Sequence, residues 1–318
     1  MPPIPRYATK RFADAVAEGL SHMPRRLPPE FFYDALGSAL FDAIGQLPWY
    51  PITRTESAML HRHREEIAAL AGEVPAIIEL GPGNGTKLAT LVGAYALQPR
   101  LDVHLVDVSP AALDAAAQTL SRDTRNVVVR THLSMYEEGA REALALRPAD
   151  GRMLTIFLGS NIGNFDRDAA DDFLRELRRL HRAGDRLLLG ADLVKSEADM
   201  LLAYDDPLGV TAAFNRNLLV RANREIGADF NIETFAHRAV WNEGQSRMEA
   251  YLVSTIRQRV RIPASSVEIV FEAGDTIWTE SSHKYDPPGI AAMLARAGFG
   301  MLHQWIDNGF ALTLGEAR

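Results

Sequence analysis

Residues 75–85 decide the fold and read Pro-Ala-Ile-Ile-Glu-Leu-Gly-Pro-Gly-Asn-Gly. The apolar run before Gly81 is typical of a short buried strand, and a helical pattern resumes over residues 87–96. Glycines at such a position let the chain turn tightly and let its backbone approach a ligand above the carboxyl ends of parallel strands. The segment therefore predicts a strand, a ligand-binding loop and a helix in succession.

The spacing of these glycines distinguishes between two cofactors. Gly81, Gly83 and Gly85 form G-x-G-x-G and lack the third glycine of the dinucleotide pattern G-x-G-x-x-G. The spacing fits a loop at the amino-acid end of S-adenosylmethionine, which has no pyrophosphate to hold. Asp107 follows the next predicted strand, residues 102–106, where a carboxylate can accept both ribose hydroxyls. Because a NAD-dependent dehydrogenase would use an acid similarly, Asp107 alone leaves that alternative open.

Outward from this loop, strand and helix patterns alternate. We expect helices over residues 55–72, from Pro110 and over 166–184, and strands over residues 153–158 and 186–190. This alternation predicts a parallel sheet with helices on both faces, which is a Rossmann-like α/β fold.

The pattern changes near Lys195. Residues 203–231 are expected to be helical and residues 260–272 to form sheet. The tail then returns to the earlier pattern, with a helix over 289–297 and a hairpin whose strands, 303–306 and 310–314, are joined by Asp307-Asn-Gly. A sheet that resumes after a different middle segment predicts an inserted or composite second domain.

The composition restricts the chemistry and the partners. The 318-residue chain has no cysteine, which excludes disulfides, cysteine-ligated zinc and thiolate catalysis. His61 and His63 do not share a helix face, so we expect no metal site. The net charge of −7 argues against nucleic acid as a partner. Without a secretory signal pattern or an apolar run of about 18 residues, we expect a monomeric cytoplasmic protein that binds no membrane.

Five unusual stretches carry a resemblance to a known family. They are Phe32-Tyr-Asp-Ala-Leu-Gly-Ser38, Leu47-Pro-Trp-Tyr50 with Thr53-Arg-Thr-Glu56, Gly159-Ser-Asn-Ile-Gly-Asn-Phe165, Ala203-Tyr-Asp-Asp206 with the segment 209–217, and Thr279-Glu-Ser-Ser-His-Lys-Tyr285. Over roughly residues 28–316 the chain resembles the histidine-specific methyltransferases that make the trimethylated betaine of histidine on the route to ergothioneine.

This resemblance implies two domains and a set of binding residues. A class I methyltransferase domain would span residues 55–194 and 286–318, and a smaller α+β substrate-binding domain would span 1–54 and 195–285. The positions that match the family's contacts with S-adenosylmethionine are Tyr33, Gly81, Lys87, Asp107, Gly159 and Asn161. The positions that match its contacts with the substrate are Tyr50, Asn164 and Tyr204 for the carboxylate and amine, and Glu280 and Ser282 for the side chain.

The resemblance also implies a reaction, the transfer of methyl groups to the α-amino group of a free amino acid, with L-histidine giving hercynine. Glu280 and Ser282, two apart on a predicted strand, share a face and favour an imidazole. Ala250 and Trp49 depart from the family's usual residues and favour a larger aromatic substrate such as tryptophan. A catalytically silent cofactor-binding protein is a further alternative. Without the resemblance, an ion pair of Glu280 with Lys284 is an equal alternative for that residue.

Overall fold

The computed structural model describes residues 6–123, 126–148 and 150–318, which divide into two compact units. The seven-stranded unit comprises Pro51–Lys195 and His283–Arg318. The three-stranded unit comprises Met1–Tyr50 and Ser196–Ser282.

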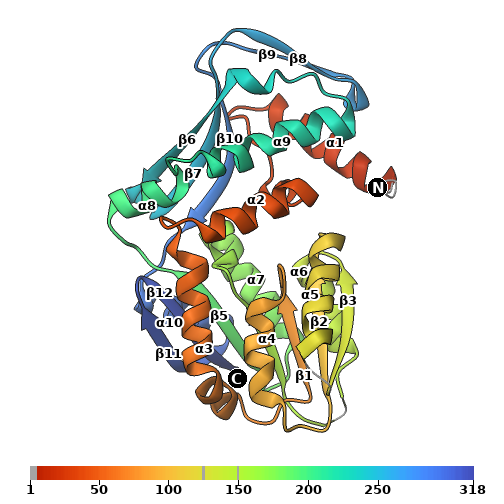
Figure 1. The fold of residues 1–318 in the computed structure, drawn as a ribbon, viewed down its shortest axis with the longest axis vertical. Helices are drawn as coiled ribbons and strands as arrows, with labels where there is room; N and C mark the ends of the chain where they lie inside the picture. Colours follow the sequence, from red (N-terminus) through yellow and green to blue (C-terminus); the bar gives the residue numbers. More distant parts are fainter. Residues whose placement is uncertain (1–5, 124–125, 149) are drawn as a thin grey trace. The chain divides into compact units, whose positions relative to one another are not determined.

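A mixed sheet forms the centre of the seven-stranded unit, with the strand order β11-β12-β5-β4-β1-β2-β3 (Figure 1). The strands are β1 (Ala76–Leu80), β2 (Leu101–Asp107), β3 (Val127–Leu133), β4 (Met153–Phe157), β5 (Arg186–Asp192), β11 (Phe299–Asp307) and β12 (Phe310–Ala317). Strands β1 to β5 pair in parallel, and β12 is antiparallel to both of its neighbours. Because the order reverses between β1 and β4, their carboxyl ends form the switch point at which such sheets bind ligands.

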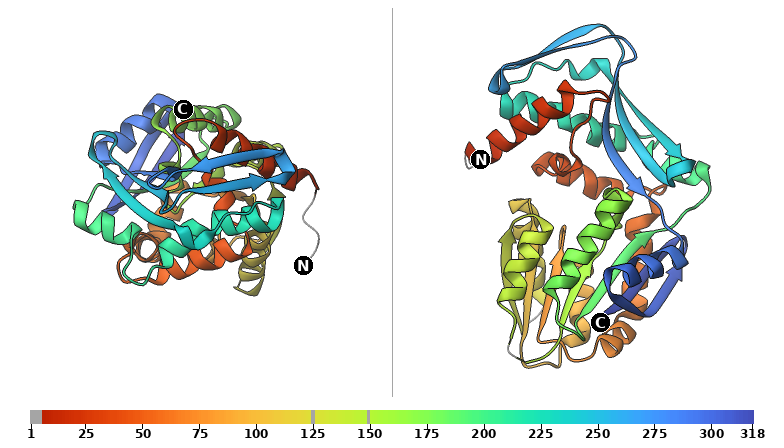
Figure 2. Two further views of the ribbon diagram at one scale, coloured as in Figure 1. Left: turned by 90° about the horizontal axis from the view of Figure 1, so that it is seen from above. Right: turned by 180° about the vertical axis from the view of Figure 1, so that it is seen from behind.

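Helices cover both faces of this sheet. One set that packs side by side contains α3 (Pro51–Ala71), α4 (Thr86–Val92) and α5 (Pro110–Asp123), and the other contains α6 (Tyr136–Ala145), α7 (Arg167–Leu180) and α10 (Pro287–Ala297). Figure 1 shows α3 and α4 in front of the sheet, and the view from behind in Figure 2 shows α7 and α10 before it. Every residue of β1, β4 and β5 is buried, as parallel strands covered on both faces require. The Rossmann-like α/β prediction is confirmed.

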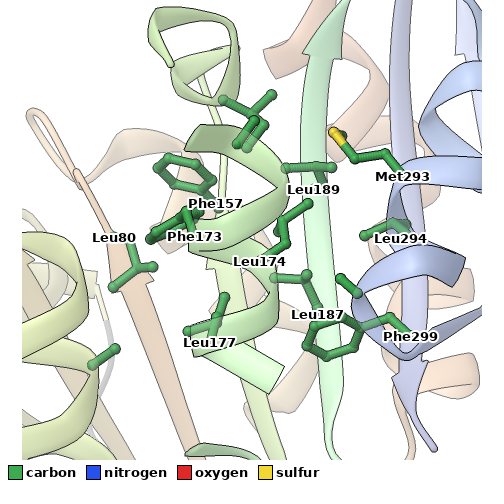
Figure 3. Close-up of a cluster of buried hydrophobic side chains, with 14 of the residues drawn as sticks. Leu80, Phe157, Phe173, Leu174, Leu177, Leu187, Leu189, Met293, Leu294 and Phe299 are labelled. Carbon is green, nitrogen blue, oxygen red and sulfur yellow. The ribbon is translucent and has the colours of Figure 1, made fainter. Parts of the chain in front are cut away.

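A cluster of buried apolar side chains fixes α7 and α10 against the sheet (Figure 3). Phe157 of β4 and Phe173 of α7 lie with ring centroids 5.1 Å apart, and Phe299 is fully buried at the start of β11. Burial of each such side chain stabilises the fold by about 1.5–3 kcal/mol. This packing holds the strand ends that carry the candidate site.

The three-stranded unit combines helices with short antiparallel pairs. Its helices are α1 (Arg6–Ser21), α2 (Ala35–Gln46), α8 (Glu197–Tyr204) and α9 (Val210–Ile226), and its strands are β6 (Phe235–Asn242), β7 (Arg247–Ser254), β8 (Gln258–Ile262), β9 (Val267–Phe271) and β10 (Thr276–His283). The sheet orders are β10-β7-β6 and β8-β9. Helices α8 and α9 both pack on β6 and β7.

Local signals located several boundaries correctly. The helix predicted over residues 55–72 ends at Ala71, directly before Gly72, whose φ is +79°, and it begins earlier than predicted, at Pro51. The predicted hairpin is formed by β11 and β12, and both Asn308 and Gly309 have positive φ, as a type I′ turn requires.

Two predicted helices are wrong in extent, and several elements were not predicted. Within residues 203–231 the chain is not continuously helical, because the carboxylate of Asp206 accepts the amides of Val210 and Thr211 and so starts a new helix there. Helix α7 ends at Leu180 rather than near Gly184, since the next residue is extended. The sequence patterns gave no prediction for β3, α6, β6 or β7.

Candidate active site

The loop between β1 and α4 lies at the switch point of the sheet. At Gly81 φ is +74°, and a Cβ there would come within 2.9 Å of Asn161 Nδ2 and 3.1 Å of the Tyr136 hydroxyl. Only glycine therefore fits this position. Gly81 and Asn161 were predicted separately as cofactor residues, and the structure brings them together.

A buried carboxylate connects two other predicted cofactor residues. Glu56 of α3 is 0% exposed and accepts a hydrogen bond from Lys87 Nζ at 2.6 Å. The same carboxylate accepts the amide of Gly159, with distances of 2.8 and 3.0 Å to its two oxygens. Glu56 thus holds α4 and the turn after β4 at one point.

Sequence reasoning missed this function of Glu56, which it placed only inside a family motif. The signal was available in the helical spacing, because Glu56 shares the buried face of α3 with Met59, Leu60 and Ile67. A glutamate on an apolar helix face is rarely buried without a partner.

Two further carboxyl groups lie near the ends of β1 and β2. Burial raises the pKa of Asp107 to about 6, although its carboxylate accepts the amide of Ser109 at 2.8 Å. Burial also raises the pKa of Glu79 to about 8, against the opposing effect of the Lys87 ammonium. Among the described residues, Oε2 of Glu79 has no hydrogen-bond partner. Such buried acids would gain stabilisation from a cationic or hydroxyl-bearing ligand.

These residues fit S-adenosylmethionine. A glycine-lined turn at Gly81 admits a close approach, the partnerless oxygen of Glu79 suits a positive charge, and Asp107 can accept ribose hydroxyls. Asn161 begins the 3-10 helix η3 (Asn161–Asn164), and the predicted substrate residue Asn164 ends it.

The three-stranded unit groups three of the predicted substrate residues. The Tyr204 hydroxyl, at the end of α8, donates to Ser282 Oγ of β10 at 2.8 Å. The rings of Tyr50 and Tyr204 meet edge to face with centroids 6.3 Å apart, and both are almost fully buried. These contacts gather two phenols and an alcohol that come from three distant parts of the chain.

Glu280 and Tyr33 are the remaining predicted residues of this unit. Glu280 is half-buried in β10, and its backbone carbonyl accepts the indole N–H of Trp278 at 2.8 Å. Tyr33 packs edge-on against Phe41 and Phe214.

Lys284, suggested above as an ion-pair partner of Glu280, has an acidic partner within its own unit. Lys284 is fully buried in the seven-stranded unit and lies 3.0 Å from Asp192.

The part of the chain that the structure describes bears on both metal-binding clusters and membrane-spanning helices. Across residues 6–123, 126–148 and 150–318, no three histidine, aspartate or glutamate residues are grouped as a metal ion would need. No helix within those ranges is both long and apolar enough to cross a membrane.

Comparison with known proteins identifies the relatives of the chain. The family model described as histidine-specific, S-adenosylmethionine-dependent methyltransferase matches residues 12–317. Proteins named histidine N-alpha-methyltransferase from Mycobacterium tuberculosis and Mycolicibacterium smegmatis are each 40% identical over 302 residues, which cover 94% of this chain and 92% of theirs. A protein named L-tryptophan methyltransferase from Psilocybe serbica is 28% identical and covers 95% of this chain and 91% of its own.

A sheet of this order with a G-x-G-x-G loop at its switch point defines a class I, S-adenosylmethionine-dependent methyltransferase, and the chain is an enzyme of that class. More narrowly, it belongs to the histidine-specific methyltransferase family. The family, the enzyme class and the cofactor predicted from the sequence are confirmed, and family membership argues against the dehydrogenase alternative.

Proposed function

We propose that this enzyme transfers methyl groups to the α-amino group of L-histidine and gives the trimethyl betaine hercynine. The observation that carries the proposal is 40% identity, over 94% of the chain, to two proteins named histidine N-alpha-methyltransferase. The grouping of Tyr50, Tyr204 and Ser282 supports a polar pocket for an amino acid.

The cofactor is assigned to Gly81, Lys87, Asp107, Gly159 and Asn161, together with Tyr33. Bound S-adenosylmethionine supplies an electrophilic methyl group on a positively charged sulfur. In this assignment Asp107 would accept the ribose hydroxyls, and Lys87, held by Glu56, would bind the carboxylate of the cofactor. The turns at Gly81 and Gly159 supply backbone that can pass close to the ligand.

The amino acid is assigned to Tyr50, Asn164 and Tyr204, with Glu280 and Ser282 at its side chain. The amide of Asn164 both donates and accepts, and tyrosine hydroxyls suit a zwitterion without adding a charge. Glu280 and Ser282 together can bind one imidazole nitrogen as acceptor and the other as donor. The segments 1–54 and 195–285 form the substrate-binding domain in this proposal.

The residues that hold the amino acid would act mainly by positioning it. The α-amino group of a free amino acid is mostly protonated at neutral pH. The site must therefore favour the neutral amine and direct its lone pair at the methyl group. Holding two reactants in line can provide about 7–11 kcal/mol of the barrier reduction. This reaction needs no nucleophilic side chain, which agrees with a chain that has no cysteine.

One specific observation favours a second candidate, N-methylation of tryptophan. Ala250 of β7 is buried, and its carbonyl accepts the hydroxyl of Thr279, next to Glu280. Alanine is a small residue at a position where the family often has a larger one, and a relative named L-tryptophan methyltransferase aligns with 95% of the chain. We also propose that the protein is cytoplasmic and monomeric.

A methylation screen tests the proposal. Purified enzyme is incubated with S-adenosylmethionine and each of the twenty amino acids, and the products are read by mass. We expect histidine to gain three methyl groups faster than any other amino acid gains one. Preferred methylation of tryptophan would move the assignment to the second candidate, and no methylated amino acid would reject both.

A further inference from the structure

A chain of hydrogen bonds crosses four elements of the three-stranded unit and ends at the predicted substrate residues. Asn215 Nδ2 of α9 lies 2.8 Å from His237 Nδ1 of β6, and His237 Nε2 lies 2.8 Å from the carbonyl oxygen of Tyr204. The hydroxyl of Tyr204 then donates to Ser282 Oγ. The side chains of Asn215, His237 and Ser282 are all at least nine-tenths buried.

The partners fix the protonation of His237. An amide nitrogen only donates, so Nδ1 accepts, whereas a carbonyl only accepts, so Nε2 carries the hydrogen. The orientation of the Asn215 amide is supported by its second bond, in which Nδ2 donates to the carbonyl of Tyr251 at 3.1 Å. Burial lowers the pKa of His237, while Asp205 and Asp206 oppose this effect and Arg216 adds to it. Because Nδ1 accepts from Asn215 and Nε2 donates to Tyr204, these contacts correspond to the neutral imidazole with its hydrogen on Nε2.

His237 also closes the end of a helix. Tyr204 is the last residue of α8, and the last four carbonyls of a helix have no partner within it. The Nε2 hydrogen of His237 satisfies the carbonyl of Tyr204. It thereby fixes where α8 ends, and with it the position from which the Tyr204 side chain reaches Ser282.

We infer that His237 is a positioning residue that acts through Tyr204 on amino-acid binding. It contacts the backbone of Tyr204, and Asn215 behind it selects the tautomer that can donate. The effect on substrate rests on the proposed function, which assigns Tyr204 and Ser282 to the amino acid. The effect of His237 on the Tyr204 hydroxyl does not depend on the proposed function.

The test compares His237→Phe, which keeps a ring but removes both nitrogens, with His237→Gln, whose amide can still donate to the Tyr204 carbonyl. We expect His237→Phe to raise the KM for the amino acid roughly threefold to tenfold, the range for one lost hydrogen bond. The dissociation constant of S-adenosylmethionine, measured by calorimetry, should stay unchanged, and His237→Gln should recover most of the KM. The matched control is His22→Gln, at an exposed histidine of the same unit, which should change neither value.

A second readout does not depend on methylation. The hydrogen-bonded hydroxyl proton of Tyr204 should give a slowly exchanging NMR signal in the wild-type protein and in His237→Gln, and should lose it in His237→Phe. A wild-type KM and an unchanged signal in folded His237→Phe would overturn the inference. If the wild-type enzyme methylates no amino acid, the proposed function fails, and the hydroxyl signal alone decides whether His237 positions Tyr204.

Discussion

The carboxylate of Glu56 lies 2.6 Å from the ammonium of Lys87 and also accepts the backbone amide of Gly159. One buried side chain from α3 therefore joins α4 to the turn that follows β4. Both partners come from the predicted cofactor site, and neither is near Glu56 in sequence. The carboxylate thereby connects two segments at the carboxyl edge of the sheet.

The first prediction concerns this carboxylate. Glu56→Ala leaves the Lys87 ammonium and the Gly159 amide without their partner, so we expect a loss of about 3 kcal/mol in the free energy of unfolding. Glu56→Gln keeps an acceptor for the amide and should lose less. Denaturant unfolding measures both variants, with Glu65→Ala, at an exposed position of α3, as the control. Equal stabilities of Glu56→Ala and the control would contradict the assignment.

The second prediction concerns the ribose hydroxyls. Asp107→Ala should weaken binding of S-adenosylmethionine by about 1.5–3 kcal/mol, the scale of hydrogen bonds to a charged group. Asp102→Ala, at the other end of the same strand, should leave the affinity unchanged. Calorimetry on the folded variants measures the affinity for S-adenosylmethionine. A wild-type affinity in Asp107→Ala would mean that Asp107 does not bind the cofactor.

The third prediction is a pH dependence of the free protein. The pKa of Glu79 is raised from 4.5 to about 8, so its stabilising contribution is complete below pH 4.5 and is lost as pH rises through about 8. Glu79→Gln removes this titration. Between pH 6 and pH 9 the free energy of unfolding should therefore fall less in the variant than in the wild type. Parallel changes in the two proteins would show that Glu79 is already ionised at pH 6.

The fourth prediction concerns the amine of the substrate. Asn164→Ala should raise the KM for the amino acid and also lower kcat, because a misplaced amine loses its alignment with the methyl group. Affinity for S-adenosylmethionine should not change. Wild-type kinetics in this variant would mean that Asn164 does not orient the amino acid.

Sequence reasoning succeeded where the signal was local. The glycine spacing after β1, the helix ends beside Gly72 and Gly298 and the Asn308-Gly309 turn each follow from a few neighbouring residues. Strand β3 was missed because it is an edge strand with most of its side chains partly exposed, so it lacks the continuous apolar run of its neighbours.

The contacts of the site could not be derived from spacing. Tyr204 and Ser282 are 78 residues apart, and Glu56 and Gly159 are 103 residues apart. Such pairs form only when the chain has folded, so the resemblance to a family proposed the residues and the structure supplied their partners. All of the assignments of residues to the cofactor and to the substrate remain predictions.

The most direct test is the ratio of kcat/KM for histidine to that for tryptophan, measured in the wild type and in Glu280→Gln. A site with buried polar partners rejects a ligand that leaves them unpaired far more strongly than a missing methylene would. We predict that the wild type prefers histidine, and that Glu280→Gln shrinks the preference while the affinity for S-adenosylmethionine stays the same. A wild-type preference for tryptophan would contradict this prediction.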